Sequence, residues 1–552
     1  MTNKPRFIFI MGGVLSGLGK GIATSSMARL LQSRGFRVTA LKIDPYINVD
    51  AGTMNPTEHG EVFVTKDGLE TDQDIGNYER FLDTELTRDN YMTTGAVYLS
   101  VIQRERNLEF RGKQVEVVPH IPQEVIRRID RAATVNKADI TLIEIGGTVG
   151  EYQNMLFLEA ARMMHLQRPG MVQFVLVSYL PIPQNIGEMK TKPTQYAVRT
   201  LNSAGIQPDF ILCRSHQPLD KPRKERLSVN CNMQPGDIIS APDVPSIYDV
   251  PLIYERDGLT DKILVKFGMR SRKKDLRDWT QFVQSSKRAK KTVTIGIAGK
   301  YFMTGAFTLL DSYISVIEAI KHAAWSIGAK PEIKWLDTED YEKDPKRVEE
   351  LAQLDGLIVP GGFGSRGIEG KLKAIHFART HNVPYFGLCY GMQLAVVEYA
   401  QNVLKLKRAN TTEVDPATPA PVIDVMSEQR QKIEEKRFGG SMRLGNYSCR
   451  LVPNSLAATA YGQRLISERH RHRYEVNNAY RVKLEHAGLS VTGVNPERNL
   501  VEIIELPNHP FFLGTQFHPE LKSHPLAPHP LFVAFLKAAA LRRQPKKPSQ
   551  KR

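Results

Sequence analysis

The stretch FIFIMGGVLSGLGKGIATSS, residues 7–26, joins an apolar strand to a helical pattern through a glycine-rich turn. Turns of this kind place backbone N–H groups and the start of a helix around phosphate groups. Gly19 and Lys20 match the core of the usual motif, but Gly13 stands one position too early and Gly21 replaces the hydroxyl residue that normally binds magnesium. The flanking strand and helix favour nucleotide binding over an ordinary glycine-rich turn, with Lys20 as the phosphate contact. The magnesium ligand must then come from elsewhere in the chain.

Near-continuous apolar runs alternate with helical patterns along most of the chain, as expected for strands covered on both faces. They occupy residues 6–11, 37–43, 139–145, 171–180 and 208–213, and again residues 292–300, 356–362 and 384–391, with a helical pattern near 308–326. This alternation predicts an α/β fold with two domains, each a mostly parallel sheet with helices on both faces. We place the domains at residues 1–268 and 292–541, with a basic linker at 269–291 and a basic, disordered tail at 542–552.

The composition of the chain limits the classes of protein to which it can belong. The chain has 552 residues, 41% of them hydrophobic and 24% charged, which is ordinary for a globular protein. Most of its net charge of +16 falls in the linker and the tail, without a nucleic-acid-binding signature, so we expect no nucleic-acid partner. The four cysteines lie far apart without a CxxC pair, and no apolar run reaches the ~18 residues of a membrane span. We therefore expect a cytoplasmic protein with no disulfide framework and no membrane partner.

Carboxylates are the natural substitutes for the missing hydroxyl, because Mg²⁺ prefers oxygen ligands. The run DITLIEIGG ends an apolar strand on Glu144, and GLETDQDIG offers Asp72 and Asp74 in a polar loop. A solvated loop acid is the alternative interpretation of each. The segment GEMKTKPTQ, residues 187–195, places lysines beside a proline that can begin a helix, which suits a second phosphate chain. A charged loop before a helix explains this composition equally well.

The run FGLCYGMQ contains a G-x-C-x-G pattern centred on Cys389. Small flanking residues allow a nucleophile to project from a strand-to-helix elbow, with the next N–H, that of Tyr390, facing an oxyanion. TQFHPE supplies His518 as a base and Glu520 to orient it, and VPGGFGSRG supplies a second oxyanion loop at Gly361 and Gly362. A buried core cysteine is the ordinary alternative, but the glycine frame and the His-x-Glu pair favour catalysis.

The elbow, PGGFG and FHPE together resemble the class I glutamine amidotransferases. With GGVLSGLGKG, LKIDPYINVDAGTM, EIGGTVG and KTKPTQ, the chain resembles the CTP synthase family over nearly its whole length. This resemblance implies a P-loop-like synthetase domain and a flavodoxin-like amidotransferase domain. It implies ATP-dependent amination of UTP to CTP with L-glutamine or ammonia as donor, Mg²⁺ as the metal and an internal ammonia channel. It also implies GTP as an allosteric activator, CTP as a product inhibitor, and a homotetramer that can form filaments.

The resemblance assigns roles to the matching residues. It implies catalysis by Cys389, His518 and Glu520, and metal binding by Asp74 and Glu144. It implies ATP binding by Gly17, Leu18, Gly19, Lys20, Gly21, Ile22, Lys42 and Asp74. It implies UTP or CTP binding by Ser16, Glu151, Tyr152, Gln153, Lys190, Thr191, Lys192, Pro193, Thr194, Gln195 and Arg226. It implies glutamine binding by Gly362, Tyr390, Gly391, Met392, Gln393, Glu413 and Arg473.

Two positions depart from the family pattern. Gln153 stands where the family usually has a carboxylate near CTP, and Arg226 stands where a lysine often contacts the nucleotide. We expect the reaction to survive and inhibition by CTP to be altered. Two other classes of function fit parts of the sequence. One is another ATP-dependent amidase, such as the cobyrinate amide synthases, which Glu520 and KTKPTQ disfavour. The other is a nucleotide-gated structural polymer or a partner-binding protein with a degenerate active site, which the intact Cys389, His518 and Glu520 disfavour.

Overall fold

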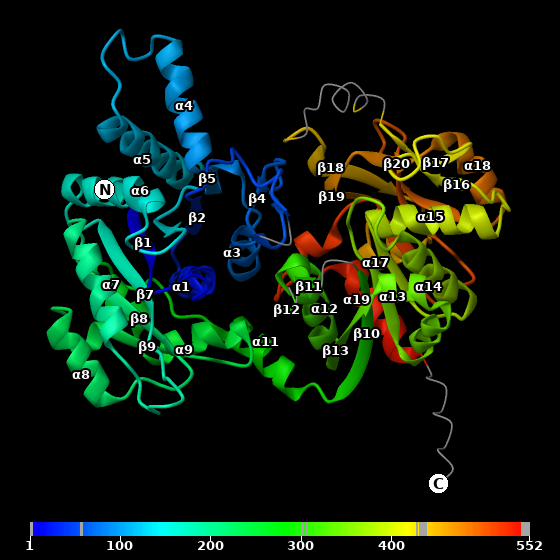
Figure 1. The fold of residues 1–552 in the computed structure, drawn as a ribbon. Helices are drawn as coiled ribbons and strands as arrows, with labels where there is room; N and C mark the ends of the chain where they lie inside the picture. Colours follow the sequence, from blue (N-terminus) through cyan, green and yellow to red (C-terminus); the bar gives the residue numbers. More distant parts are fainter. Residues whose placement is uncertain are drawn as a thin grey trace. The chain divides into compact units, whose positions relative to one another are not determined.

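The structure is a computed structural model that describes residues 4–55, 59–299, 303–304, 307–308, 310–426, 429 and 439–542. The chain divides into two compact units. Unit 1 comprises Met1–Ala51 and Asp74–Val283, and unit 2 comprises Gly52–Gln73 and Gln284–Arg552. The division differs from the expected domain boundaries, because Gly52–Gln73 packs with the carboxy-terminal half of the chain. Each unit is an α/β structure (Figure 1), so the predicted fold class is confirmed.

Unit 1 is built on a seven-stranded sheet with the order β5-β2-β6-β1-β7-β8-β9. All neighbouring strands pair in parallel. The strands are β1 (Arg6–Gly13), β2 (Val38–Asp44), β5 (Tyr91–Thr93), β6 (Ile140–Ile145), β7 (Val172–Tyr179), β8 (Phe210–Ser215) and β9 (Ile238–Pro242). Because β1 is central, the turn that follows it opens at the carboxyl edge of the sheet, where open α/β sheets bind their ligands.

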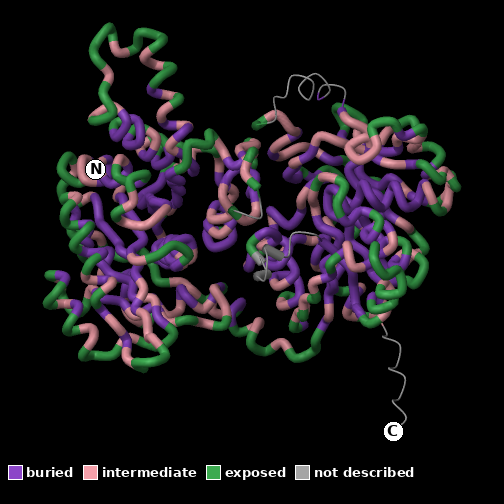
Figure 2. The backbone as a smooth tube through the Cα atoms, in the orientation of Figure 1, coloured by how far each residue is buried: buried purple, intermediate pink, exposed green. Residues whose placement is uncertain are grey.

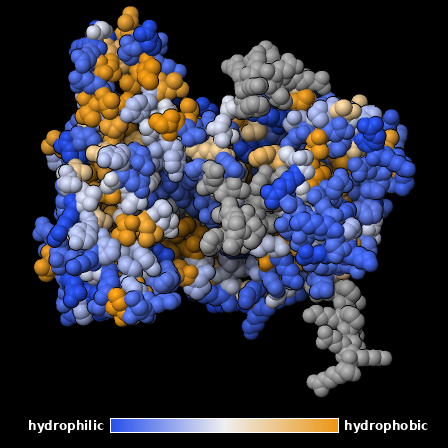
Figure 3. Space-filling view, in the orientation of Figure 1, coloured by the Kyte–Doolittle hydropathy of each residue, from blue (hydrophilic) through white to orange (hydrophobic). Residues whose placement is uncertain are grey.

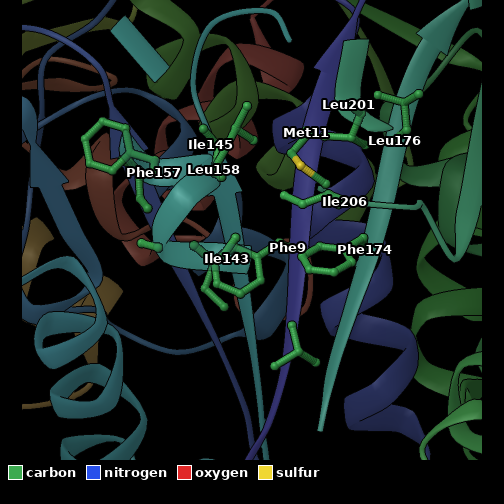
Figure 4. Packing of buried hydrophobic residues seen from close by; sticks show 14 of the residues in the cluster. Phe9, Met11, Ile143, Ile145, Phe157, Leu158, Phe174, Leu176, Leu201 and Ile206 are labelled. Carbon is green, nitrogen blue, oxygen red and sulfur yellow. The ribbon is translucent and has the colours of Figure 1, made fainter. Parts of the chain in front are cut away.

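Helices cover both faces of this sheet, which leaves the strands buried (Figure 2). They are α1 (Lys20–Ser33), α3 (Asp74–Leu82), α4 (Thr94–Arg106), α5 (Val117–Val135), α6 (Met155–Gln167), α7 (Lys192–Ser203), α8 (Lys221–Asn230), α9 (Val250–Arg256) and α10 (Leu259–Lys266). Phe7, Phe9 and Met11 of β1 belong to one buried cluster with residues of α5, α6 and α7. Figure 4 shows Phe9 and Met11 in this cluster. Ile8 and Ile10 alternate with them and are also fully buried. This explains why the β1 sequence is continuously apolar.

The segment expected to be a basic linker, residues 269–291, contains helix α11 (Arg277–Arg288). Trp279 of α11 is completely buried, packs at an angle against the rings of Phe81 and Tyr248, and donates its indole N–H to the Tyr248 carbonyl at 3.0 Å. Before the helix, Arg272 pairs with Asp139 at 2.8 Å. The segment is therefore packed on unit 1 as far as Val283. Residues 543–552 of the expected tail lie outside the described residues.

Unit 2 contains a nine-stranded sheet with the order β13-β10-β14-β15-β23-β22-β21-β18-β19. The parallel part comprises β10 (Lys291–Gly299), β13 (Ala329–Asp337), β14 (Gly356–Val359), β15 (Tyr385–Leu388) and β23 (Phe512–Thr515). An antiparallel part continues through β22 (Val501–Glu505), β21 (Ser490–Val494), β18 (Arg443–Leu451) and β19 (Leu465–His472). The apolar runs had indicated only part of this sheet, because strands such as β13, β18 and β19 mix buried with partly exposed residues.

The helices of unit 2 are α12 (Ile314–Ser326), α13 (Thr338–Lys343), α14 (Ile368–Thr380), α15 (Tyr390–Asn402), α17 (Leu456–Tyr461), α18 (Asn478–His486) and α19 (Pro530–Leu541). Three small sheets complete the unit: β3 (Phe63–Val64) with β4 (Glu70–Thr71), β11 (Met303–Thr304) with β12 (Phe307–Thr308), and β16 (Ala409–Thr411) with β17 (Ala420–Val425) and β20 (Tyr474–Val476). None of the helices in the described part of the chain is both long and apolar enough to cross a membrane.

Candidate active sites

The glycine-rich turn connects the end of β1 to the first residue of α1, Lys20. Gly17 and Gly19 have φ values of 72° and 79°, in the left-handed region that glycine adopts without strain. The Lys20 side chain crosses to the turn after β6 and donates to the Gly147 carbonyl at 2.7 Å. Burial lowers the pKa of Lys20. The turn therefore presents backbone N–H groups, a helix start and a partly desolvated cation, which together suit a phosphate chain.

Gly21 is explained by the carboxylate that lies against it. A Cβ atom at Gly21 would meet Oδ1 of Asp74 at 1.9 Å. Any larger residue would displace this carboxylate, so the position of the usual hydroxyl is taken by an oxygen of Asp74, at the start of α3. Asp74 in turn forms an ion pair with Lys42 of β2, and Lys42 donates to Oε1 of Glu144 on β6 at 2.9 Å. The structure therefore places a carboxylate against the position where a phosphate-binding turn usually carries a hydroxyl.

The donor set around Lys42 is suited to a divalent cation. Burial, followed by the nearby charge of Asp74, raises the pKa of Glu144, whose other oxygen accepts a hydrogen bond from Tyr78. No cluster of three or more His, Cys, Asp or Glu side chains is arranged to hold a metal ion within the described residues. Two carboxylates nevertheless fit Mg²⁺, which normally keeps waters and phosphate oxygens as its other ligands. Asp72, the other acid considered in this loop, belongs to unit 2.

Two further segments expected to bind nucleotide meet this turn. The Gly147 residue that receives Lys20 also lies against Glu151, because a Cβ atom there would be 2.5 Å from the Glu151 carboxylate. On the other side, Thr194 of α7 shares a hydrogen bond of 2.8 Å with Ser178 at the end of β7. A Cβ atom at Gly13 would meet Ala197 of α7 at 2.7 Å. The carboxyl ends of β1, β6 and β7 therefore gather the turn, the loop after β6 and the start of α7.

Some expected nucleotide contacts lie toward solvent. Tyr152 is 91% exposed, and Gln153 beside it is exposed as well. Arg226 lies on the exposed side of α8. One turn earlier in the same helix, Arg223 pairs with Glu188 at 3.0 Å, and Glu188 also pairs with Lys190 at 2.7 Å. The sequence had not indicated Arg223, which is the α8 residue that reaches the segment before α7.

In unit 2, Cys389 stands at the elbow between β15 and α15. Its φ of 49° and ψ of −97° are unusual for a non-glycine residue, as expected at a nucleophile elbow. Its neighbours must be glycine: a Cβ atom at Gly391 would meet the Val359 carbonyl at 2.1 Å, and one at Gly387 would meet Gly391 at 2.8 Å. The G-x-C-x-G pattern therefore reflects close backbone packing around one projecting thiol.

His518 and Glu520 follow the end of β23, the strand next to β15. Nδ1 of His518 lies 2.7 Å from Oε1 of Glu520, while its Nε2 atom is buried and makes no hydrogen bond to the described residues. Burial alone would lower the pKa of His518, but the charges of Glu520 and Cys389 raise it well above its usual value. Gly361 packs against the same ring, since its Cβ atom would lie 2.8 Å from Cε1 of His518. This arrangement can exchange a proton with the thiol.

Two pockets of unit 2 open onto Cys389. The larger, of about 270 Å³, is lined by Gly52, Gly362, Phe363, Cys389, Gln393, Glu413, Met442, Arg471, His472, Arg473 and Tyr474. Four of the residues expected to bind glutamine are therefore together: Gly362, Gln393, Glu413 and Arg473. Tyr390, Gly391 and Met392 are not part of this lining among the described residues. They form the buried first turn of α15, and Tyr390 donates its hydroxyl to the Gly364 carbonyl at 3.0 Å.

The second pocket, of about 100 Å³, also reaches Cys389 and is lined in part by Glu61 and Val62. These residues belong to Gly52–Gln73, the segment that unit 2 receives from the amino-terminal half of the chain. In the same segment, Glu70 is buried and accepts from Nε of Arg471 at 2.8 Å. Arg471 lines both pockets. The site around Cys389 is therefore partly built by a segment that precedes α3.

Sequence reasoning missed three polar residues of this site: Glu70, Arg471 and Gln516. Glu70 lies within GLETDQDIG and Gln516 within TQFHPE, so both were in stretches already singled out. Nothing in the residue types distinguished them from solvated neighbours. Their burial at 1% for Glu70 and 0% for Gln516 becomes visible only in the fold.

Comparisons with known proteins match both halves of the chain. Residues 6–269 match the family model described as CTP synthase N-terminus, and residues 308–538 match glutamine amidotransferase class-I. The CTP synthase of Pelotomaculum thermopropionicum is 50% identical over 537 residues, covering 97% of this chain and 98% of the relative. The CTP synthase of Carboxydothermus hydrogenoformans is 50% identical over 536 residues, with the same coverage of 97% and 98%.

Among solved structures, the glutaminase domain of Trypanosoma brucei CTPS with bound acivicin is 37% identical. It covers 47% of this chain and 98% of its own, with a TM-score of 0.42. The sequence matches alone extend over nearly the full length of both this chain and its relatives. The chain therefore belongs to the CTP synthase family of glutamine-dependent ligases.

Proposed function

We propose that this chain forms CTP from UTP by two reactions at separate sites, one in each unit. The observation that carries the proposal is the pair of polar constellations described above: a phosphate-binding turn with two carboxylates in unit 1, and a cysteine elbow with a His–Glu pair in unit 2. The first suits ATP-dependent activation of an acceptor, and the second suits release of ammonia from glutamine.

In unit 2, Cys389 is the nucleophile. His518 takes the thiol proton, and the sulfur attacks the amide carbon of glutamine. The C–N bond breaks as His518 returns the proton to nitrogen, which leaves as ammonia. Water then hydrolyses the thioester to glutamate and restores the thiol. Glu520 orients His518, and the backbone N–H groups of Tyr390 and Gly362 face the developing oxyanion. Glu413 and Arg473 fit the charged ends of the glutamine main chain.

In unit 1, the O4 atom of UTP attacks the γ-phosphorus of ATP and releases ADP. Ammonia then adds at C4, and the C4–O4 bond breaks with loss of phosphate and a proton. Lys20 and the turn from Gly17 to Ile22 hold phosphate oxygens. Asp74 and Glu144 would hold Mg²⁺, which neutralises phosphate charge when it is bound. Lys20 donates to the Gly147 carbonyl, and Gly147 lies against Glu151. This arrangement supports an ATP site and a pyrimidine site that lie next to each other.

The remaining assignments are part of the same proposal. Ser16, Glu151–Gln153 and Lys190–Gln195 contribute to a site for UTP, which CTP occupies as an inhibitor, and GTP activates glutamine hydrolysis. Gln153 and Arg226, which are both exposed, differ from the residues that the family usually has near CTP. The strength of inhibition by CTP therefore differs from that of the family. Self-assembly into tetramers is supported by exposed apolar side chains around α4, which gather on the surface of unit 1 (Figure 3): Leu99, Ile102, Leu108, Val117 and Val118.

The test is to combine the purified chain with UTP, ATP and Mg²⁺ and to measure CTP with glutamine or with ammonium as donor. Formation of CTP from both donors supports the proposal. Hydrolysis of glutamine without CTP from either donor would contradict it and point to a different acceptor, as in the cobyrinate amide synthases. Loss of all three activities in a folded protein would instead favour a structural polymer.

A further inference from the structure

The side chain of Gln516 is a buried amide that lies next to Cys389. This side chain is completely inaccessible to solvent, and the backbone N–H of Gln516 donates to the Glu502 carbonyl at 2.8 Å. Its Nε2 atom lies 3.6 Å from Sγ of Cys389, within the hydrogen-bond range for sulfur. On the neighbouring strand, the Cys389 N–H donates to the Thr515 carbonyl at 2.6 Å. The amide and the thiol are therefore held together by the pairing of β15 with β23.

The orientation of the Gln516 amide is fixed by a chain of hydrogen bonds that ends on a backbone carbonyl. A carbonyl can only accept, so the side-chain atom of Gln393 that lies 2.7 Å from the Tyr474 oxygen must be its NH₂ group. The same NH₂ group lies 3.2 Å from the Gln516 side chain, which must therefore present its oxygen there. The NH₂ group of Gln516 is left facing Cys389. If the Gln516 amide were flipped, its NH₂ group would face the NH₂ group of Gln393, and its oxygen would face the sulfur.

Besides His518, which takes its proton in the proposed reaction, the sulfur contacts one acceptor and one donor: the Arg471 carbonyl and the Gln516 amide. As a thiol, Cys389 donates weakly to the Arg471 carbonyl at 3.8 Å and accepts from Gln516. Once the proton has moved to His518, the Arg471 carbonyl faces a negative sulfur without a hydrogen between them. The hydrogen bond from Gln516 then becomes charge-assisted and stronger. The two contacts therefore act in opposite directions on ionisation, and Gln516 is the one that favours the reactive form.

We propose that Gln516 is a further catalytic residue, whose amide N–H group stabilises the thiolate of Cys389, and that Gln393 acts as the positioning residue that keeps this donor aimed at the sulfur. The inference deepens the glutaminase half of the proposed function and depends on it. It assigns Gln393 a role besides lining the glutamine pocket, since its NH₂ group is already committed to Tyr474 and Gln516.

The test is the pH dependence of iodoacetamide alkylation at Cys389, followed by peptide mass spectrometry in the full-length chain. Gln516→Met keeps the length of the side chain but removes the donor. We expect the midpoint of the alkylation profile to move up by about one pH unit or more. We expect kcat/KM for glutamine to fall by about tenfold to a hundredfold, mainly through kcat, with ammonia-dependent CTP formation unchanged.

Two further variants make the result interpretable. Gln516→Glu has nearly the same shape but places a second acceptor beside the sulfur, so it should move the midpoint further than Gln516→Met. Gln401→Met is the matched control, because it removes another side-chain hydrogen bond of α15, to the Ala409 carbonyl at 2.8 Å, away from the thiol. It should leave both the midpoint and kcat/KM unchanged. The other charged or titratable groups around the thiol stay constant in all variants: His518, Glu520, Arg471, Glu70, Glu61, Glu413, Arg473 and His472.

An unchanged midpoint in both Gln516 variants would overturn the inference, even if glutamine turnover fell, because a purely structural role would lower activity without changing the ionisation of the thiol. The proposed function fails in a different way. If Cys389 of the wild-type chain is not alkylated faster as the pH rises, or if Cys389→Ala retains glutamine turnover, the nucleophile itself is wrongly assigned. If the wild-type chain behaves as expected and the Gln516 variants have the wild-type alkylation midpoint, only the role of Gln516 is refuted.

Discussion

At the scale of single residues, Gly21 places the altered phosphate-binding motif against Asp74, the carboxylate proposed to bind the metal. Gly21→Ala should displace Asp74, because the added Cβ atom would lie 1.9 Å from the carboxylate. We expect CTP formation from both glutamine and ammonia to fall by at least about tenfold, since both donors share the activation step. The measurement is the initial rate of CTP formation as Mg²⁺ is titrated.

Gly236→Ala is the control for this change. Gly236 is exposed in the same unit and has open space around the position of its Cβ atom. Its rate should match that of the unaltered chain. A Gly21→Ala variant with a normal magnesium titration would show that Asp74 does not need its present position. The proposal that Asp74 substitutes for the missing hydroxyl would then be wrong.

The protonation of His518 is a second property that is determined by a single residue and its immediate neighbours. Burial lowers the pKa of His518, but the charges of Glu520 and Cys389 raise it more. The acid form needed for ammonia departure therefore persists to higher pH than in a free histidine. Glu520→Gln should lower the pKa of His518 and move the alkaline limb of glutamine hydrolysis to lower pH. Rates measured from about pH 6 to 10 test this, and an unmoved alkaline limb would contradict the assigned role of Glu520.

At the scale of elements, the β3–β4 segment is part of the glutaminase unit although it precedes α3 in sequence. Glu70→Gln should break the ion pair with Arg471, which lines both pockets beside Cys389. We expect kcat/KM for glutamine to fall by about tenfold and ammonia-dependent CTP formation to be preserved, because the pair lies within unit 2. Steady-state assays with each donor provide the measurement.

Lys66→Gln is the control within the same segment, because Lys66 is exposed. It should leave both activities unchanged. If Glu70→Gln affected ammonia and glutamine as donors equally, the pair would not act on the glutaminase site alone, and the local role of the segment would be wrong.

The elements also explain what the sequence could and could not predict. The central strands β1, β6 and β7 were predicted because strands buried on both faces are continuously apolar. The strands β3 and β4 each have two residues, too few to produce a periodic pattern. Their packing with unit 2 depends on tertiary contacts such as the one between Glu70 and Arg471.

The candidate sites show the same contrast. Cys389, Gly19 and Lys20 were visible because their chemistry needs a fixed local spacing. From the residues alone, Asp74 was one of two candidate loop acids, and the family resemblance favoured it. Its contact with Gly21 is a property of the fold. Gln516 had no distinguishing signal, since a glutamine is usually solvated and its donor role depends on neighbouring strands.

At the scale of the whole molecule, the proposed self-assembly depends on the apolar surface around α4. Ile102 and Leu108 are 54% and 71% exposed. Replacing both with lysine should reduce the mass measured by light scattering, because charges would be buried in an interface. Circular dichroism should show that the fold is retained.

Val229→Lys is the matched control, since Val229 is an apolar residue of α8 with 82% exposure. It should leave the mass unchanged. If the double variant has the same mass as the unaltered chain, this surface is not the one through which copies assemble.

If one chain carries two chemically separate sites, loss of the thiol should affect only one of them, and Cys389→Ala is the decisive variant. The measurement is CTP formation from UTP and ATP with either glutamine or ammonium as donor, on the same preparation. We predict no CTP from glutamine and an unchanged rate from ammonium, because only the source of ammonia is lost. Retained synthesis from glutamine, or loss of synthesis from ammonium in a folded protein, would contradict the separation of the two sites.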